Sequence, residues 1–326
     1  MKSFSNTPQL SIFRIGEAAR DLLKSGSEGR ILAGFSNAAY LASIYDELFW
    51  LVTENIPMHR RSIQIPGSFP RIPADSSFSV KGQHLFLGPD IDLDLSLASI
   101  WVTPRPNLDK LLPFEVIPDL LQTVSCLFDD FPTPTGFGCI LLEITRIARG
   151  NPLPAALPDC GLALKYAWPA LNEIVLACTT NDFPLILRTF EDLIGLGEGL
   201  TPSGDDFIGG LLYSSFTFQE IYTQCQGFTL SDVELFLDNS RNRTNLISYT
   251  IMKDLATGHT CDTLHRFINA ILTDQPLESI NHLGLELVRI GHSTGWDLLT
   301  GVWMGMLLSI GSQAALSCNV PAFTSS

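Results

Sequence analysis

The hydrophobic pattern of this chain changes once, and that change constrains the fold more than any other feature. Before Thr103-Pro104-Arg105-Pro106-Asn107, short apolar segments are separated by Gly, Pro, Asn and Asp, which is typical of β-strands joined by tight turns. After Leu111 the apolar residues recur about every three and a half positions, which indicates helices. Because strands and helices are segregated along the chain, the pattern disfavours a parallel α/β architecture.

We therefore predict an α+β fold, with a β-rich domain over residues 1–107 and a mostly helical domain over residues 108–326. The first domain is expected to be a small sheet or barrel that begins with a helix near Leu10–Ser25 and has a hairpin turn at Lys81-Gly82-Gln83. The expected strands are Arg30–Phe35, Ala39–Ile44, Leu48–Thr53, Ser62–Ile65, Ser77–Lys81, His84–Leu87, Ile91–Leu95 and Ser99–Val102. The expected helices are Phe114–Phe128, Gly136–Arg149, Leu162–Ala177, Phe183–Leu193, Phe207–Tyr222, Leu230–Leu255, Thr263–Leu272, Leu277–Ile290 and Asp297–Ile310.

Composition excludes several classes of protein. Apolar residues make up 45% of the chain and charged residues 17%, which describes an ordered globular protein. The net charge of −14 leaves no basic surface for nucleic acid. The longest apolar run, Leu298 to Ile310, is too short to span a membrane, and the N-terminus lacks the apolar core of a signal peptide. Seven scattered cysteines without a CxxC pair favour reduced thiols, so we expect a cytoplasmic protein without a nucleic-acid or membrane partner.

Residues 195–212 are the densest motif of the chain. Gly197, Gly199 and Gly204 lie among other glycines around a Thr-Pro-Ser turn, and an apolar helix follows directly. We expect Thr201 or Ser203 to cap that helix, and its free amides to bind a small anion such as phosphate or a carboxylate. The adjacent Asp205 and Asp206 add negative charge at the same point, where they can offset the helix dipole, bind a cation or take a proton.

The same pattern occurs again 91 residues later. Ser203-Gly204-Asp205-Asp206-Phe207-Ile208-Gly209-Gly210 aligns with Thr294-Gly295-Trp296-Asp297-Leu298-Leu299-Thr300-Gly301. One interpretation is that two helices merely begin with similar caps. The other is that the two helix starts frame one ligand, with Asp206 and Asp297 as paired carboxylates and His292 beside them. On this second interpretation Ser293, Thr294 and Gly295 join the anion-binding residues.

Two further segments have related sequences. Thr244 and Ser248 lie four residues apart within a predicted helix, so we expect their hydroxyls to share a face and to contact the anion. Thr133-Pro134-Thr135-Gly136 echoes the Thr-Pro-Ser-Gly turn but is followed by Phe137 instead of acids. We interpret this segment as an ordinary helix start.

Taken in order, these motifs resemble those of a known bacterial family. Its signature, GLGxGLTPSGDDF, occurs here at 195–207, followed by Thr244-x-x-Ile247-Ser248 and His292-Ser293-Thr294-Gly295-x-Asp297. That family includes the small subunit of the three-subunit oxamate carbamoyltransferase of allantoin degradation. The resemblance implies carbamoyl transfer between oxalurate and phosphate, giving oxamate and carbamoyl phosphate, and two larger protein subunits as partners. The Ser-x-Arg-Thr motif of ordinary carbamoyltransferases is absent, because Arg241-Asn242-Arg243-Thr244 has arginine at the serine position.

Two other functions remain open at this point. The first is a stand-alone enzyme in which Asp205, Asp206 and Asp297 hold a divalent cation, since oxygen ligands suit magnesium or manganese. The second is a non-catalytic subunit that binds a ligand or supports assembly. In the catalytic interpretations the candidate residues are Asp205, Asp206, His292 and Asp297.

Overall fold

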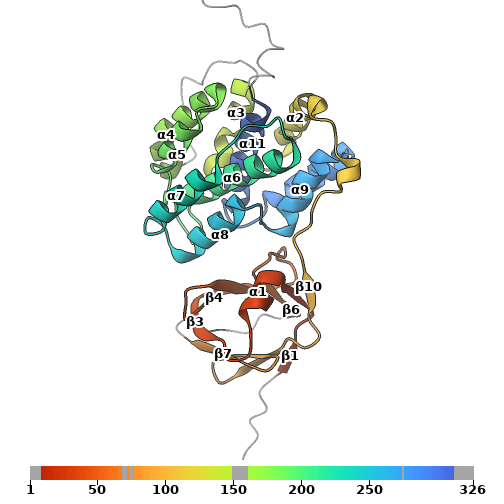
Figure 1. Ribbon diagram of the computed structural model, residues 1–326, viewed down its shortest axis with the longest axis vertical. Coiled ribbons are helices and arrows are strands. Elements are labelled where there is room, and N and C mark those ends of the chain that lie inside the picture. Colours follow the sequence, from red (N-terminus) through yellow and green to blue (C-terminus); the bar gives the residue numbers. More distant parts are fainter. Residues whose placement is uncertain (1–8, 68–71, 73–75, 149–160, 274, 312–326) are drawn as a thin grey trace, which may run out of the picture. The chain divides into compact units, whose positions relative to one another are not determined.

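The computed structural model describes residues 9–67, 72, 76–148, 161–273 and 275–311. It divides the chain into two compact units. One runs to Pro104 and includes Thr260–Asp262, and the other contains the remaining residues from Arg105 onward. Figure 1 shows that the strands gather in the first unit and the long helices in the second. The α+β fold with strands before helices is therefore confirmed.

The first unit contains one sheet of ten strands among its described residues, in the order β1-β9-β8-β7-β3-β4-β5-β6-β2-β10. The strands are β1 (Gln9–Ser11), β2 (Arg14–Gly16), β3 (Glu28–Gly34), β4 (Ala38–Ser43), β5 (Leu48–Thr53), β6 (Ser62–Ile65), β7 (Ser77–Lys81), β8 (His84–Leu87), β9 (Ile91–Asp94) and β10 (Ser99–Trp101). Side chains alternate between the two faces, as in β8, where Leu85 and Leu87 are buried and their neighbours are not. The predicted hairpin turn is confirmed, because Lys81 pairs with His84.

The sheet curls into a half-barrel, as its connections require. Strands β1 and β2 stand eight places apart in the sheet, which would separate them by about 38 Å if the sheet were flat. Yet only Ile12 and Phe13 join them, and three residue steps reach at most about 11 Å. Curling brings the two ends together around a core that includes Leu41, Phe49 and Ile63.

The predicted helix near Leu10–Ser25 is wrong for its first half. Residues of β1 pair with β9, and residues of β2 pair with β6 and β10, so only α1 (Glu17–Leu22) is helical there. These partners lie far away in sequence, and the local apolar pattern could not reveal them.

The second unit is built around two buried helices, α6 (Ser203–Ile221) and α11 (Thr294–Ile310). Figure 1 shows the other helices arranged around this pair. They are α2 (Ile117–Ser125), α3 (Leu141–Ala148), α4 (Leu162–Thr180), α5 (Phe183–Phe190), α7 (Leu230–Ser240), α8 (Leu246–Ala256), α9 (Asp262–Leu272) and α10 (Leu277–Leu287). Short 3₁₀ helices cover Leu108–Lys110, Phe114–Val116, Cys126–Asp130 and Gly136–Ile140. A helix buried on nearly every side is expected to lack a polar face, as both α6 and α11 do over most of their length.

The predicted helix Leu230–Leu255 is two helices. The chain leaves α7 after Ser240 and enters α8 only at Leu246. The side chain of Asn245 accepts hydrogen bonds from the amides of Ile247 and Ser248 and so caps α8. This cap competes with a continuous helix, and it was missed because the apolar spacing continues across the break.

The predictions about a membrane span and about reduced cysteines have different outcomes. Within the described part of the chain, no helix is both long and apolar enough to cross a lipid bilayer. The expectation of reduced cysteines is wrong for Cys139, which is disulfide-bonded, whereas Cys126, Cys178, Cys225 and Cys261 are free thiols. Spacing along the sequence cannot reveal such a pairing, because it depends on which sulfur atoms meet in space.

Candidate functional site

The two halves of the repeated motif begin helices that run parallel and in contact. Gly210 of α6 faces the carbonyl of Leu298, and the equivalent Gly301 of α11 faces the carbonyl of Phe207. The contact is therefore reciprocal, as across a two-fold axis. Farther along, Gly305 of α11 faces the carbonyl of Leu211, so both helices advance in the same direction. Their N-termini lie at the same end of the pair.

Both helix starts are held against the segment that precedes them. The amide of Gly204 donates to the carbonyl of Leu196 at 2.9 Å, and the equivalent amide of Gly295 donates to the carbonyl of Ile290 at 2.9 Å. The amides of Asp205, Asp206 and Asp297 likewise donate to protein carbonyls. These amides are not free to bind an anion. The predicted caps are also absent, since no side chain caps α6, whose N-cap position is Pro202.

Asp206 and Asp297 occupy equivalent positions in the two first turns, and both are buried, with exposures of 2% and 0%. Burial raises the pKa of Asp206 well above its usual value, and the nearby carboxylate of Asp297 raises it further. The hydroxyls of Thr201 and Thr294 oppose this shift. Burial raises the pKa of Asp297 to about 6, whereas hydrogen bonds from the amide of Phe137 and from the hydroxyls of Ser203 and Ser293 lower it.

Both shifts favour the uncharged forms of the two carboxyls. Because burial and mutual repulsion disfavour two adjacent negative charges, the pair favours the state in which one carboxyl is protonated and the other is ionised. Both lie in the first turns of parallel helices, whose dipoles favour the negative charge. In the described chain, the Oδ2 atoms of both residues are buried and have no hydrogen-bond partner. Unpaired buried oxygens at a shared position mark this pair as the chemically distinctive part of the site.

Each helix start supplies a hydroxyl to the aspartate of the other helix. The hydroxyl of Thr294, the first residue of α11, lowers the pKa of Asp206 in α6, and the hydroxyl of the equivalent Ser203 lowers the pKa of Asp297 in α11. The hydroxyls of Thr201 and Thr294 lie 3.1 Å apart. Thr201, Ser293 and Thr294 are partly exposed, so this layer of hydroxyls lies between the buried carboxyls and solvent.

Asp205 has a different environment from its neighbour. Its Oδ1 accepts a 2.7 Å hydrogen bond from the amide of Gly195, and its Oδ2 accepts from the hydroxyls of Thr244 and Ser248, the latter at 2.6 Å. The prediction placed both residues within one helix, but Thr244 precedes α8. Both hydroxyls bind Asp205, which ties the glycine-rich loop and α8 to α6.

A third segment reaches the site, and sequence reasoning missed it. The amide of Phe137 donates a 2.6 Å hydrogen bond to Oδ1 of Asp297. Gly136 has a φ of +56°, and a Cβ there would collide with the carboxylate of Asp297 and with Ser293. The hydroxyl of Thr135 donates to the carbonyl of His292 at 2.9 Å. The resemblance of Thr133-Pro134-Thr135-Gly136 to the main motif was the available signal.

The remaining predicted residues lie at the edge of the site. Gly197 packs against Ser203, whereas Gly199 and His292 are exposed. The backbone carbonyl of His292 accepts the hydrogen bond from Thr135 described above.

The three aspartates do not assemble into a metal centre. Asp205 has both oxygens engaged by protein donors, which leaves Asp206 and Asp297 as a pair. In the described ranges, no three side chains of His, Cys, Asp or Glu are grouped in a way that could hold a metal ion. The described residues therefore do not form the predicted cluster of three aspartates.

No solved structure matches this chain. A family match is found, and apart from Thr260–Asp262 it lies in the helical unit. It includes both helix starts, the Asp205 contacts and the Asp206–Asp297 pair. Residues 193–306 match the family model of the oxamate carbamoyltransferase subunit AllH.

Proposed function

We propose that this chain is a subunit of an oxamate carbamoyltransferase and that Asp206 and Asp297 move the proton that carbamoyl transfer requires. The family match over residues 193–306 supports the first part. The second rests on one observation, namely two buried carboxyls with raised pKa values and unpaired oxygens inside the matched segment.

The proposed reaction needs one proton to change position. An oxygen of phosphate forms a bond to the ureido carbon of oxalurate, and the bond from that carbon to the oxamate nitrogen breaks. The phosphate hydroxyl loses its proton, and the departing nitrogen gains one, so protons balance. Asp297, whose pKa is about 6, accepts the first proton, and Asp206, whose pKa burial and the carboxylate of Asp297 raise well above its usual value, supplies the second.

The anion-binding part of the proposal uses hydroxyl groups. The amides of Gly204 and Gly295 are engaged by carbonyls, and Thr244 and Ser248 are engaged by Asp205. The partly exposed hydroxyls of Thr201, Ser293 and Thr294, which also contact the carboxyl pair, bind the phosphate or the substrate carboxylate, with the loop containing Gly197 and Gly199 beside them. The raised pKa of Asp206 favours its uncharged form, which lowers the electrostatic cost of placing an anion there.

The test measures carbamoyl phosphate formed from oxalurate and phosphate by the enzyme assembled with its partner subunits. We expect Asp206→Asn and Asp297→Asn each to lower kcat by about 10²- to 10⁴-fold, the usual contribution of a general acid or base. Asp192→Asn, on the exposed surface before the glycine-rich loop, is the control and should leave kcat unchanged. In the wild type, kcat should rise through about pH 6 as Asp297 ionises.

Two results would contradict parts of the proposal. If both Asn variants assemble normally and keep full activity, the carboxyl pair does not move the proton. If the assembled wild-type enzyme forms no carbamoyl phosphate and takes no carbamoyl group from it, the assigned reaction is wrong.

A further inference from the structure

The two carboxyls are equivalent in position but differ in their hydrogen-bond donors. Two hydroxyl groups lower the pKa of Asp206, and two others lower the pKa of Asp297. Oδ1 of Asp297 also accepts a 2.6 Å hydrogen bond from the backbone amide of Phe137, which lowers its pKa more than either hydroxyl does. This amide belongs to neither α6 nor α11 but to the 3₁₀ helix Gly136–Ile140. The difference between the two carboxyls therefore comes from a third segment.

The amide of Phe137 favours the charged form of Asp297. An N–H group binds a carboxylate more strongly than a neutral carboxyl, so this hydrogen bond favours ionisation. The titratable group that faces Asp297 is Asp206 of α6, and repulsion between the two carboxylates is mutual. The other groups that lower the pKa of Asp297, the hydroxyls of Ser203 and Ser293, are uncharged. The Phe137 amide is therefore the donor whose position most affects the ionisation of Asp297.

A second hydrogen bond holds the segment that carries this amide. The hydroxyl of Thr135 donates to the backbone carbonyl of His292 at 2.9 Å. Thr135 lies two residues before Phe137, and His292 lies five residues before Asp297, so both bonds join the same two segments. The first bond has a backbone donor and the second a side-chain donor. The second is therefore the one that a substitution in this segment can remove.

Apolar packing also keeps the segment in place. The side chain of Phe137 is fully buried, and its ring centroid lies 5.8 Å from that of Phe207. Gly138 packs closely against the ring of Trp296. Such packing is not directional, whereas a hydrogen bond weakens steeply as its angle departs from linear. Loss of the Thr135 bond should therefore change the direction of the amide without unfolding the segment.

We infer that Thr135 is a positioning residue, which holds the amide of Phe137 against the carboxylate of Asp297. It acts through its hydrogen bond to the carbonyl of His292. The inference rests on the proposed role of Asp297 as the proton acceptor. It also gives the segment Thr133-Pro134-Thr135-Gly136 a function beyond that of a helix start.

The experiment follows the side-chain carboxyl of Asp297 in the full chain by ¹³C NMR as pH changes, with its signal identified by its absence in Asp297→Asn. The wild-type midpoint should lie near pH 6. Thr135→Val removes the hydroxyl and keeps the size of the side chain. It should raise the midpoint by about 0.5–1 pH unit, the effect of weakening one hydrogen bond to a charged group. Thr135→Ser keeps the hydroxyl and should retain the wild-type midpoint. In the enzyme assembled with its partner subunits, the pH profile of kcat should shift by the same amount.

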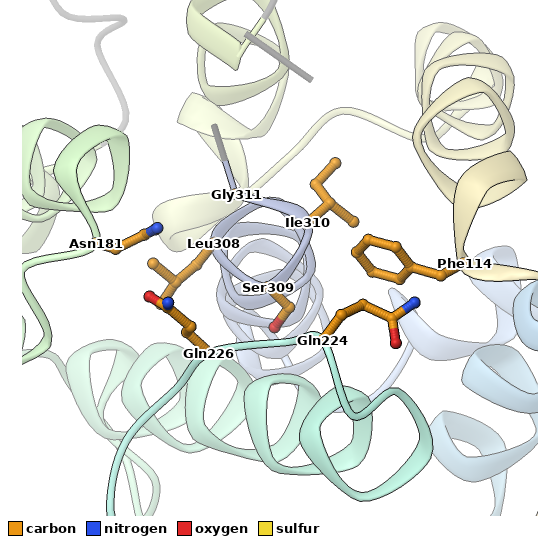
Figure 2. Close-up of a pocket in the computed structure, with 8 residues that line it drawn as sticks. All are labelled: Phe114, Asn181, Gln224, Gln226, Leu308, Ser309, Ile310 and Gly311. Carbon is orange, nitrogen blue, oxygen red and sulfur yellow. The ribbon is translucent and has the colours of Figure 1, made fainter. Parts of the chain in front are cut away.

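Ser309→Ala is the matched control. The hydroxyl of Ser309 also donates to a backbone carbonyl, that of Gly305, at 2.7 Å. Figure 2 shows Ser309 at a cavity of about 200 Å³ at the other end of α11. Twelve residues separate it from Asp297, which corresponds to about 18 Å along the helix. This variant loses a comparable hydrogen bond and should leave the midpoint unchanged.

Three results would overturn the inference: an unchanged midpoint in folded Thr135→Val, or an equal shift in Thr135→Ser or in Ser309→Ala. If Thr135→Val does not fold, Thr135→Ala removes the same hydroxyl and is judged by the same midpoint. A shifted carboxyl midpoint with an unshifted kcat profile would support the positioning of Asp297 by Thr135 and contradict the catalytic role proposed for Asp297.

Discussion

Asp206 and Asp297 lie at equivalent positions in two parallel helices, and the carboxylate of Asp297 raises the pKa of Asp206. The relationship spans 91 positions of sequence. It depends on glycines that let α6 and α11 approach closely and on a third segment that binds Asp297 through the amide of Phe137. The arrangement makes the stability of the protein and its proposed chemistry depend on the same two groups.

The carboxyl pair should make the protein less stable as pH rises. The folded-state pKa of Asp297 is about 6, above its usual value of 3.8, so the folded state binds this proton more tightly than the unfolded state. The resulting stability is complete below about pH 4 and is lost as pH rises to about 6, at up to about 1.4 kcal/mol per pH unit. Asp206 extends the loss to higher pH.

Urea unfolding across this range measures the effect. Relative to the wild type, Asp297→Asn should lose less stability between about pH 4 and pH 7, by about 3 kcal/mol. Asp192→Asn should follow the wild-type curve. An Asp297→Asn variant with the wild-type pH dependence would show that this carboxyl does not titrate as described.

Gly136→Ala should be strongly destabilising. Its φ of +56° strains any residue with a Cβ, and the added atom collides with the carboxylate of Asp297. Gly88→Ala is a matched control, since Gly88 has a φ of +57° and open space around it. The control should cost about 1–2 kcal/mol from the backbone alone. Gly136→Ala should cost at least about 1 kcal/mol more, and equal losses in chemical denaturation would contradict the described contact.

Gly301→Ala tests the close packing of α6 and α11. A Cβ at this position meets the backbone carbonyl of Phe207, which cannot move without shifting the helix. We expect a loss of about 1–3 kcal/mol in unfolding free energy, although alanine favours a helix by about 1 kcal/mol. Gly209→Ala is the control, because its new atom meets only the flexible end of Leu255. A smaller loss in the control, seen in thermal melts, is the expected pattern.

Asp205 and Asp206 should differ in their effect on stability although they are adjacent. Asp205→Ala leaves the amide of Gly195 and the hydroxyls of Thr244 and Ser248 without their acceptor, and should cost about 3–5 kcal/mol. Ser248→Ala removes one of these donors and should cost about 1 kcal/mol.

Asp206→Ala should cost less than Asp205→Ala at neutral pH, because one Asp206 oxygen is unpaired. Denaturation of the three variants under one buffer condition gives the ranking. A loss in Asp206→Ala equal to that in Asp205→Ala would contradict it.

Much of the fold could be predicted because it depends on local periodicity. Eight expected strands correspond to β3 through β10, since alternation and turn residues define them without reference to distant partners. The strands β1 and β2 could not be predicted, because three-residue strands are stabilised by pairing with β9, β6 and β10. The break before α8 was hidden because apolar spacing continues through the residues that Asn245 caps.

The sequence by itself determined that the chain is β-rich first and helical afterwards, and that two helices begin with the same motif. Periodicity and repetition are local properties, so they can be read along the chain. Only the tertiary structure decided that Asp206 pairs with Asp297 while Asp205 binds Gly195, Thr244 and Ser248, and that Phe137 joins them. Burial, pKa and hydrogen-bond partners depend on which segments meet in space, and adjacent aspartates in one helix turn face different neighbours.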